Sequence, residues 1–149
     1  MSESLLAAGV RAAEARQVSV FLENEPGILA EVLHRLADAG VNLHTMSVAE
    51  TERFGILRTM VSDPDAAVAA LDELGVVTMV VDVLVVEVPN RPGGLAEIVQ
   101  VFSDAGVSVR YVYAEMGGTA DRAVLIMRLN PSEGALTLLL LRLRKMPLP

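Results

Sequence analysis

A short segment occurs twice in this chain, each time where a strand-like run changes into a helical one. The first corner is Glu23-Asn24-Glu25-Pro26-Gly27-Ile28-Leu29, and the second corner is Pro89-Asn90-Arg91-Pro92-Gly93-Gly94-Leu95. Asn hydrogen-bonds nearby backbone, Pro presets φ for a first helical residue, and Gly allows a close backbone approach. The segment predicts a tight strand-to-helix corner with free backbone N–H groups, which is a candidate site for a carboxylate or a phosphate. The alternative is that Asn-x-Pro-Gly simply makes a good turn.

The first corner lies within a run of alternating strand and helix patterns. Strands are predicted at 18–22, 41–50, 54–61 and 76–81, where β-branched and apolar residues are concentrated. A helix with apolar residues at helical spacing follows the corner and ends before Gly40, and a second helix starts at Asp63-Pro64 and ends at Gly75. The order β-α-β-β-α-β is that of a ferredoxin-like unit.

The same pattern then restarts at an offset of 66. Positions 24–43 and 90–109 share ten of twenty residues, which indicates an internal duplication. The second copy has a strand at 84–88, a helix that ends before Gly106, and strands at about 107–115 and 122–129 joined by a turn at 116–119. Its last helix is predicted to start at Asn130-Pro131, with Glu133 as a capping-box acid.

The second copy lacks a matching end. The segment that corresponds to the fourth strand of the first copy is 143–149, and its prolines cannot donate to a strand ladder. The four leucines at 138–141 also occupy every side of a helix, so this end packs against a partner or the leader, or the chain end is irregular. We favour an interface. The predicted fold class is α+β, with two ferredoxin-like βαββαβ units in tandem and the second without a full last strand. The predicted domains are a first unit at 17–83 and a second at 84–149. They follow a leader at 1–16 that is either a short docking helix or a frayed tail.

Composition narrows the functional classes. A net charge of −7 argues against a nucleic-acid partner, and the absence of cysteine removes thiolate catalysis and cysteine metal sites. The two histidines, His34 and His44, lack the spacing of a helical zinc site, and no nucleotide-binding motif or catalytic set is marked. We therefore expect no catalytic residues, no metal and no cofactor. The start of the chain does not match a signal peptide, and no apolar run is long enough for a membrane helix, so a cytoplasmic protein is expected.

At this point the chain resembles the ACT domain family. The features that carry the resemblance are the β-α-β-β-α-β order, Asn-x-Pro-Gly-x-Leu after the first strand, and Ala-Gly-Val before the second. Two copies with almost nothing else resemble the stand-alone tandem ACT proteins of bacteria, which are amino-acid-binding regulators. The resemblance covers about residues 17–146.

The resemblance implies a small-molecule site at interfaces between ACT units, built from both corners. The residues implied at the first corner are Asn24, Pro26, Gly27, Ile28 and Leu29. Those implied at the second corner are Asn90, Pro92, Gly93, Gly94 and Leu95. The physical chemistry agrees, because backbone N–H groups at 27–29 and 93–95 are suited to a carboxylate and Asn side chains to an ammonium group.

The second corner has two features of its own. Arg91 can bind a carboxylate bidentately, and Gly94 stands where the first corner has Ile28, which gives extra room or a closer backbone approach. We hypothesise that the second corner is the better anion site; the alternative is that Arg91 is a solvated loop charge. The family's usual opposite wall would come from 42–50 and 108–115, where His44, Tyr111 and Tyr113 are either ligand-facing or packing residues.

Together these observations predict a non-catalytic regulator that binds an amino acid or related small carboxylate. A homodimer is expected, because ferredoxin-like sheets leave open edges, and a regulated enzyme is a possible partner. The alternative is a structural or assembly module that pairs with a partner protein through sheet edges and the apolar C-terminal helix.

Overall fold

The computed structural model describes residues 5–7, 9–115 and 119–143. The chain divides into two compact units, one formed by Arg16–Val81 and the other by Met1–Ala15 together with Asp82–Pro149. We call the first the inserted unit and the second the split unit, because the first lies in the sequence between the two parts of the second. Two strands, β2 (Val10–Glu23) and β5 (Thr78–Pro89), contain residues of both units.

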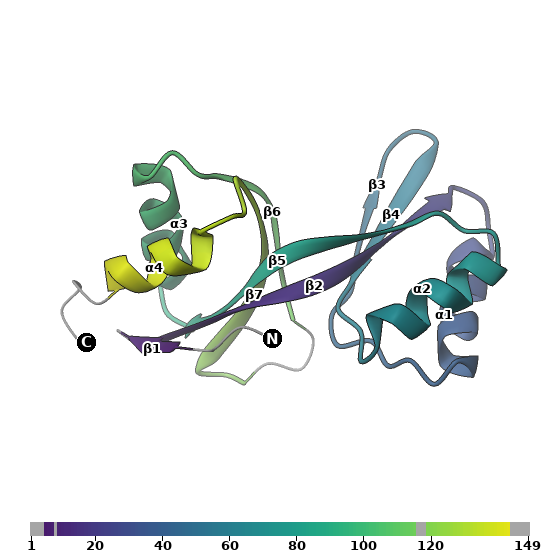
Figure 1. Cartoon of the computed structure of the whole chain (residues 1–149), viewed down its shortest axis with the longest axis horizontal. Helices are drawn as coiled ribbons and strands as arrows, with labels where there is room; N and C mark the ends of the chain where they lie inside the picture. Colours follow the sequence, from purple (N-terminus) through teal and green to yellow (C-terminus); the bar gives the residue numbers. More distant parts are fainter. Residues whose placement is uncertain (1–4, 8, 116–118, 144–149) are drawn as a thin grey trace. The chain divides into compact units, whose positions relative to one another are not determined.

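The inserted unit is a four-stranded sheet with two helices on one face (Figure 1). Its strands lie in the order β3 (Ser47–Glu50), β4 (Phe54–Thr59), β2 and β5, and β4 is antiparallel to both β3 and β2. The helices are α1 (Ile28–Asp38) and α2 (Pro64–Glu73). Asp63 caps α2 as predicted, accepting from the Ala66 N–H at 3.1 Å.

The split unit has the same plan with an added strand. Its strands lie in the order β1 (Leu5–Ala7), β2, β5, β7 (Arg122–Asn130) and β6 (Ser108–Ala114). Helices α3 (Gly94–Asp104) and α4 (Ala135–Leu143) cover one face of this sheet (Figure 1).

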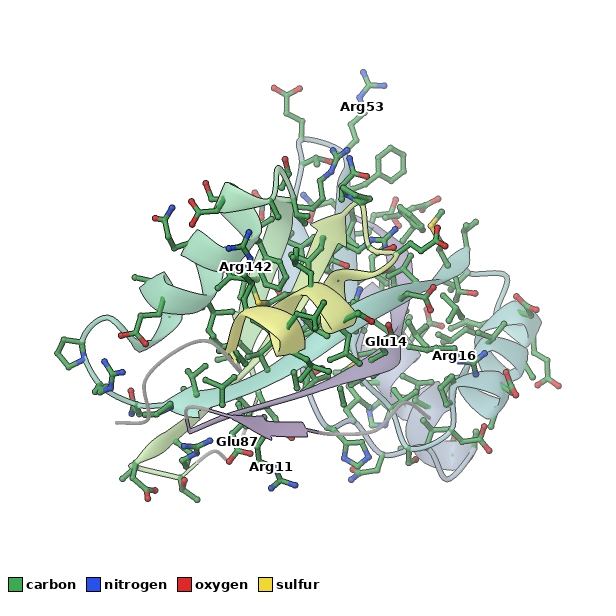
Figure 2. The ribbon with its side chains drawn as sticks, turned by 60° about the vertical axis from the view of Figure 1, so that its left-hand side comes forward. Arg11, Glu14, Arg16, Arg53, Glu87 and Arg142 are labelled. Atoms are coloured by element: carbon green, nitrogen blue, oxygen red, sulfur yellow. The ribbon has the colours of Figure 1, made fainter. Side chains whose placement is uncertain are left out.

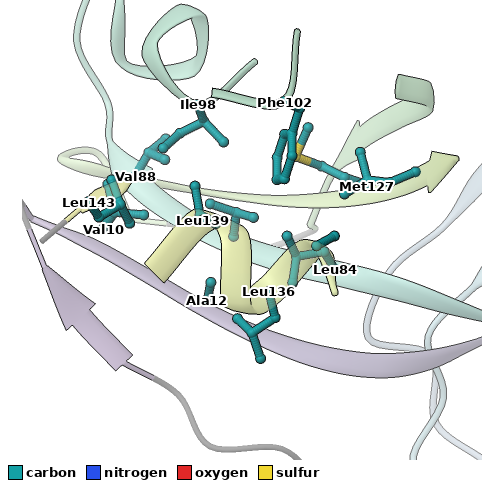
Figure 3. Packing of buried hydrophobic residues seen from close by; sticks show 13 residues of the cluster. Val10, Ala12, Leu84, Val88, Ile98, Phe102, Met127, Leu136, Leu139 and Leu143 are labelled. Carbon is teal, nitrogen blue, oxygen red and sulfur yellow. The ribbon is translucent and has the colours of Figure 1, made fainter. Parts of the chain in front are cut away.

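Each unit has a hydrophobic core of its own. In the inserted unit the buried side chains alternate along β2 and β4 and meet the apolar faces of both helices. In the split unit Phe102 and Ile98 of α3 pack with Met127 of β7 and Leu139 of α4 (Figure 3). The two buried clusters share no residue among those described, so the duplication seen in the sequence is also a duplication of cores.

The predicted fold of two ferredoxin-like units is confirmed, and the structure shows how the second unit manages without a last strand of its own. The place beside β5 is taken by the N-terminal end of β2. Both interpretations of the leader, helix or frayed tail, are therefore wrong for its described part. Val10 and Ala12 are 4% and 2% exposed and belong to the split unit's core. Alternate burial along an Ala-rich run is the pattern of a strand with one covered face.

Several predicted boundaries also move. The strands predicted at 76–81 and 84–88 are one strand, β5, because neither glycine nor proline separates them. The strand predicted at 41–50 is regular only over β3: Leu43 pairs with Val61 in an isolated bridge whose register differs by one residue from the β3–β4 register. Helix α4 starts at Ala135 rather than at Pro131, because Asn130 still pairs with Ser108 at the end of β7. The predicted turn residues 116–118 and the end of the chain, 144–149, lie outside the described residues.

The leucine run of α4 packs against the core of its own unit more than we expected. Leu139 and Leu143 are buried, and Leu138 and Leu140 are partly buried against the same core. Only Leu141 of this run is largely exposed, at 53%. The described part of α4 therefore needs no partner to cover most of its apolar surface.

Candidate functional site

The first corner connects β2 to α1 through a left-handed glycine. Gly27 has φ 93°, a region that favours glycine, and it is the N-cap of α1 without any side-chain cap. Glu25 N–H donates to the Glu23 carbonyl at 2.8 Å, and Glu31 N–H donates to the Gly27 carbonyl at 2.9 Å. The Ile28 N–H, which we expected to be free, donates to the Glu25 carbonyl at 3.4 Å. Among the described residues no acceptor takes the N–H groups of Leu29 and Ala30. These N–H groups are available to an anion at the positive end of the helix.

The second corner repeats this backbone bond by bond. Gly93 has φ 86° and is the N-cap of α3, again without a side-chain cap. Arg91 N–H donates to the Pro89 carbonyl at 3.0 Å, and Glu97 N–H donates to the Gly93 carbonyl at 3.1 Å. Both bonds match those of the first corner at the offset of 66. The Gly94 N–H, which we expected to be free, donates to the Arg91 carbonyl at 3.1 Å. The N–H groups of Leu95 and Ala96 have no acceptor within the described part of the chain.

Gly94 is explained by a close backbone approach rather than by extra room. A Cβ atom built on Gly94 would lie 2.6 Å from the Pro89 carbonyl oxygen, which no real side chain tolerates. Ile28 occupies the equivalent place in the first corner and packs partly against the inserted unit's core. The two corners therefore differ slightly in path although their hydrogen bonds correspond.

The two asparagines are used differently. The main-chain N–H of each donates to the following strand hairpin: Asn24 to the Arg53 carbonyl at 3.3 Å and Asn90 to the Asp121 carbonyl at 2.9 Å. The Asn90 side chain makes a further bond, from Nδ2 to the Ala120 carbonyl at 3.0 Å. The Asn24 side chain has no hydrogen-bond partner among the described residues. The amide of Asn24 is thus available to a ligand, whereas that of Asn90 holds a loop.

Arg91 is already paired inside its own corner. Its Nη2 lies 3.2 Å from both carboxylate oxygens of Glu97, and Nη1 donates to the Pro92 carbonyl at 3.3 Å. Both side chains of this ion pair are just under half exposed. Arg91 is thus an exposed loop charge, as the alternative had it, with Glu97 as its partner. Sequence reasoning missed Glu97 as the partner of Arg91.

The corners also differ in local charge. The first corner and the first turn of α1 carry the carboxylates of Glu23, Glu25 and Glu31. The equivalent positions of the second copy hold Pro89, Arg91 and Glu97. Because the backbone hydrogen bonds of the two corners correspond, this difference in charge means that the second corner repels an anion less than the first corner does.

Of the remaining predicted residues, the prolines and leucines lie at the two corners, and the histidine and the two tyrosines lie on other segments. Pro26 and Pro92 are exposed at the two turns, and Leu29 and Leu95 are half-buried. His44 is exposed, and its N–H donates to the Met60 carbonyl at 2.8 Å. Tyr111 and Tyr113 share one face of β6, with stacked rings whose centroids are 6.4 Å apart.

No group of three or more His, Cys, Asp or Glu side chains suited to a metal ion occurs in the described ranges. No helix in that part of the chain is long and apolar enough to span a membrane. An open hollow of about 420 Å³ lies along α3 beside Glu97, Gln100 and Asp104. Because side chains of a single helix line it, it does not enclose a ligand.

Two ferredoxin-like units, each with a glycine-capped Asn-x-Pro-Gly corner at a helix N-terminus, define a tandem ferredoxin-like class of fold. The family model for the ACT domain pair matches residues 13–146. The chain therefore belongs to the ACT domain pair family.

Solved structures share the fold of this chain. Protein BT0572 from Bacteroides thetaiotaomicron is 36% identical, with a TM-score of 0.81 over 88% of this chain and 90% of that one. The ligand-free regulatory subunit of aspartate kinase from Thermus thermophilus is 18% identical, with a TM-score of 0.63 over 91% of this chain and 97% of that one. The regulatory subunit from Thermus flavus is 19% identical at the same TM-score and coverage. The last two show a shared fold. No curated protein matches the chain significantly.

Proposed function

We propose that this chain is a non-catalytic regulator that binds an amino acid, or a related small carboxylate, at its strand-to-helix corners. The observation that carries the proposal is the repeated backbone of the two corners, in which the N–H groups of Leu29 and Ala30, and of Leu95 and Ala96, have no acceptor among the described residues. A ligand carboxylate would accept from these groups. The regulatory subunits that share the fold point in the same direction.

The signal would be a population shift. A ligand that binds one arrangement of the protein better than another favours that arrangement, and a partner enzyme or a second copy would respond to it. The alternative of an assembly module has less support than ligand binding, because the leucine run of α4 mostly packs on its own unit.

A thermal-shift screen against the common amino acids and a few keto and aryl acids tests the proposal. At about one hundred times the dissociation constant, a ligand stabilises by roughly 2.7 kcal/mol, a shift of about 5–10 °C for a chain of this length. Ala30→Pro and Ala96→Pro remove one free N–H from each corner at exposed first-turn positions where Pro is tolerated. Each variant should abolish the shift due to its own corner and serve as the control for the other. A shift that survives in the double variant would contradict binding at the corners.

We also propose that the second corner is the better anion site. Arg91 lies at that corner, and a ligand carboxylate would compete with Glu97 for its guanidinium group. Arg91→Ala should weaken carboxylate binding at this corner about tenfold, the effect of one charge-assisted hydrogen bond at a half-exposed site. Glu97→Gln should strengthen it, because the competing carboxylate is removed. Isothermal titration measures both, and an unchanged affinity for every ligand in Arg91→Ala would end the hypothesis.

A further inference from the structure

Three charged side chains form a bridge on the helix-free side of the split unit's sheet. Glu87 of β5 lies at its centre and points away from the core, since its neighbours Val86 and Val88 are core residues. The Glu87 carboxylate accepts from Nε of Arg122 at 3.2 Å and lies 3.8 Å from Nη1 of Arg11. Arg122 Nη2 also donates to the Glu87 main-chain carbonyl at 3.5 Å. Arg11 and Glu87 lie next to each other in Figure 2. We call Arg11, Glu87 and Arg122 the ionic bridge.

The ionic bridge ends beside the second corner. Arg122 is opposite Pro89 in the register of β5 and β7. The two residues that precede Arg122 hold the corner itself. The Asn90 N–H donates to the Asp121 carbonyl at 2.9 Å, and Asn90 Nδ2 donates to the Ala120 carbonyl at 3.0 Å. A change in the position of Arg122 is therefore transmitted to the start of the second corner through three consecutive residues of one strand end.

The N-terminal end of the chain also meets the second corner directly. Gly9 lies at the turn before β2, and a Cβ atom built on it would lie 3.4 Å from Cγ of Pro89. The carbonyl of the same proline accepts from the Arg91 N–H at 3.0 Å and lies close to Gly94. The ring of Pro89 thus lies near the turn that leads into β2, and its carbonyl oxygen contacts the backbone of the corner.

The first corner is built without these charges. At the offset of 66, Phe21 stands where the second copy has Glu87. Phe54 takes the place of Arg122, because each is opposite the residue that precedes its corner asparagine. The Asn24 side chain has no hydrogen-bond partner among the described residues. The same fold therefore forms its corner without an ionic bridge, so the bridge is a feature of the second copy alone.

We propose that the N-terminal end of β2, residues 10–15, positions the second corner for its ligand, and that Glu87 and Arg122 transmit this effect as positioning residues. The inference rests on the proposed function of the corners as ligand sites. A corner that is already restricted loses less conformational freedom when an anion binds, which raises its affinity. Because coupling between two equilibria is reciprocal, docking of the strand and binding at the second corner favour each other. The first corner, which lacks the ionic bridge, is not coupled to this strand end.

The sign of one substitution separates positioning from a simple effect of charge. Glu87→Gln removes a negative charge near the second corner, so a purely electrostatic role would strengthen anion binding there. Positioning predicts the opposite: the dissociation constant should rise about threefold to tenfold, the effect of weakening a charge-assisted hydrogen bond at a partly buried site. Glu97→Gln is the matched control, because the same chemical change at the same corner releases Arg91 and should strengthen binding.

An NMR titration of the full chain with inorganic phosphate measures each corner separately. Phosphate is the probe because it accepts hydrogen bonds from N–H groups at helix N-termini. The amide signals of Leu95 and Ala96 report binding at the second corner, and those of Leu29 and Ala30 report binding at the first. The first corner is thus an internal reference, and its dissociation constant should be the same in the wild type and in every variant of the ionic bridge.

Arg11→Ala tests the contribution of the strand itself. It should raise the dissociation constant of the second corner about twofold to fivefold, the effect of one exposed ion pair. Arg16→Ala is the matched control: Arg16 lies on the same strand, is similarly exposed and pairs with Asp65 of the inserted unit at 3.4 Å (Figure 2). It should leave the second corner unchanged. Circular dichroism checks that each variant is folded.

Hydrogen exchange in the absence of phosphate tests the positioning independently of binding. The Asn90 N–H should exchange faster in Glu87→Gln and in Arg11→Ala than in the wild type. The Asn24 N–H, which donates to the Arg53 carbonyl, should not change. Stronger or unchanged phosphate binding in Glu87→Gln would overturn the proposal, as would unchanged exchange at Asn90 in both variants. If phosphate shifts no corner signal in the wild type, that result counts against the proposed function, and exchange at Asn90 alone decides whether the strand positions the corner.

Discussion

At the scale of single residues, the two neighbouring glycines of the second corner are required for different physical reasons. Gly93 needs its positive φ, whereas Gly94 needs the absence of a side chain because a Cβ would lie only 2.6 Å from the Pro89 carbonyl oxygen. The sequence marked both glycines, but it could not distinguish extra room from a close approach, because the path of Pro89 depends on how β5 enters the corner.

Gly94→Ala should therefore destabilise the protein, although Gly→Ala usually favours a helix by about 1 kcal/mol. Relief of the 2.6 Å contact requires a backbone shift, for which we expect a cost of about 1–3 kcal/mol. Gly55→Ala is the control, since a Cβ there would meet its neighbours at 3.7 Å and 3.8 Å. Urea unfolding measures both, and equal stability of Gly94→Ala and the wild type would contradict the close approach.

The two corner asparagines give a second residue-scale prediction. Asn90→Ala removes the bond from Nδ2 to the Ala120 carbonyl and should cost about 0.5–1.5 kcal/mol of unfolding free energy. Asn24→Ala removes no side-chain bond among the described residues and should change stability by less than about 0.5 kcal/mol. Chemical denaturation of the two variants side by side is the measurement. A larger loss in Asn24→Ala would show that its amide is a structural group, unavailable to a ligand.

At the scale of elements, side chains replace part of a strand ladder beside β4. The Thr59 hydroxyl donates to the Thr45 carbonyl at 2.7 Å, and the Thr45 hydroxyl accepts from the Met60 N–H at 2.7 Å. Both threonines are almost fully buried. This arrangement accompanies the register change between the Leu43–Val61 bridge and β3, and it explains why a run that alternates like a strand is regular only from Ser47.

Thr59→Val keeps the shape of the side chain but leaves the buried Thr45 carbonyl without this donor. We expect a loss of about 1–3 kcal/mol. Thr137→Val on α4 is the control: Thr137 is exposed, so its replacement should stay within about 0.5 kcal/mol. Hydrogen exchange should also show faster exchange at Met60 and His44 in the Thr59 variant. Unchanged stability and exchange would mean that the threonine pair does not hold this segment.

At the element scale, the sequence also predicted the local structure of the corners better than that of the leader. Corners are local: Pro, Gly and the first helical turn lie within seven residues, so their pattern is sufficient. The strand at 10–16 depends instead on contacts with β5, more than sixty residues away in the sequence, and its Ala-rich composition favours a helix in isolation. The Arg91–Glu97 pair was missed for a similar reason, because the direction of a guanidinium group is set by the turn geometry.

At the scale of the whole molecule, the split unit depends on an N-terminal segment that precedes the inserted unit in the sequence. The split unit is built from residues at both ends of the chain, and Val10 and Ala12 of β2 contribute to its core. The inserted unit has its core entirely within residues 18–76. Loss of the N-terminal segment should therefore affect the two units unequally, although both contain part of β2.

Deletion of residues 1–15 tests this dependence. The split unit loses the strand beside β5, the Arg11–Glu87 ion pair and two core side chains, so amides of α3 and β7 should lose protection from hydrogen exchange. Amides of α1 and β4 should stay protected, because Arg16–Glu23 still completes the inserted unit. Val10→Ala is a milder variant that keeps the strand and should destabilise the split unit alone, by about 0.5–2 kcal/mol. Equal loss of protection in both units would mean that they fold as one cooperative block, and no loss in either would mean that the N-terminal strand is dispensable.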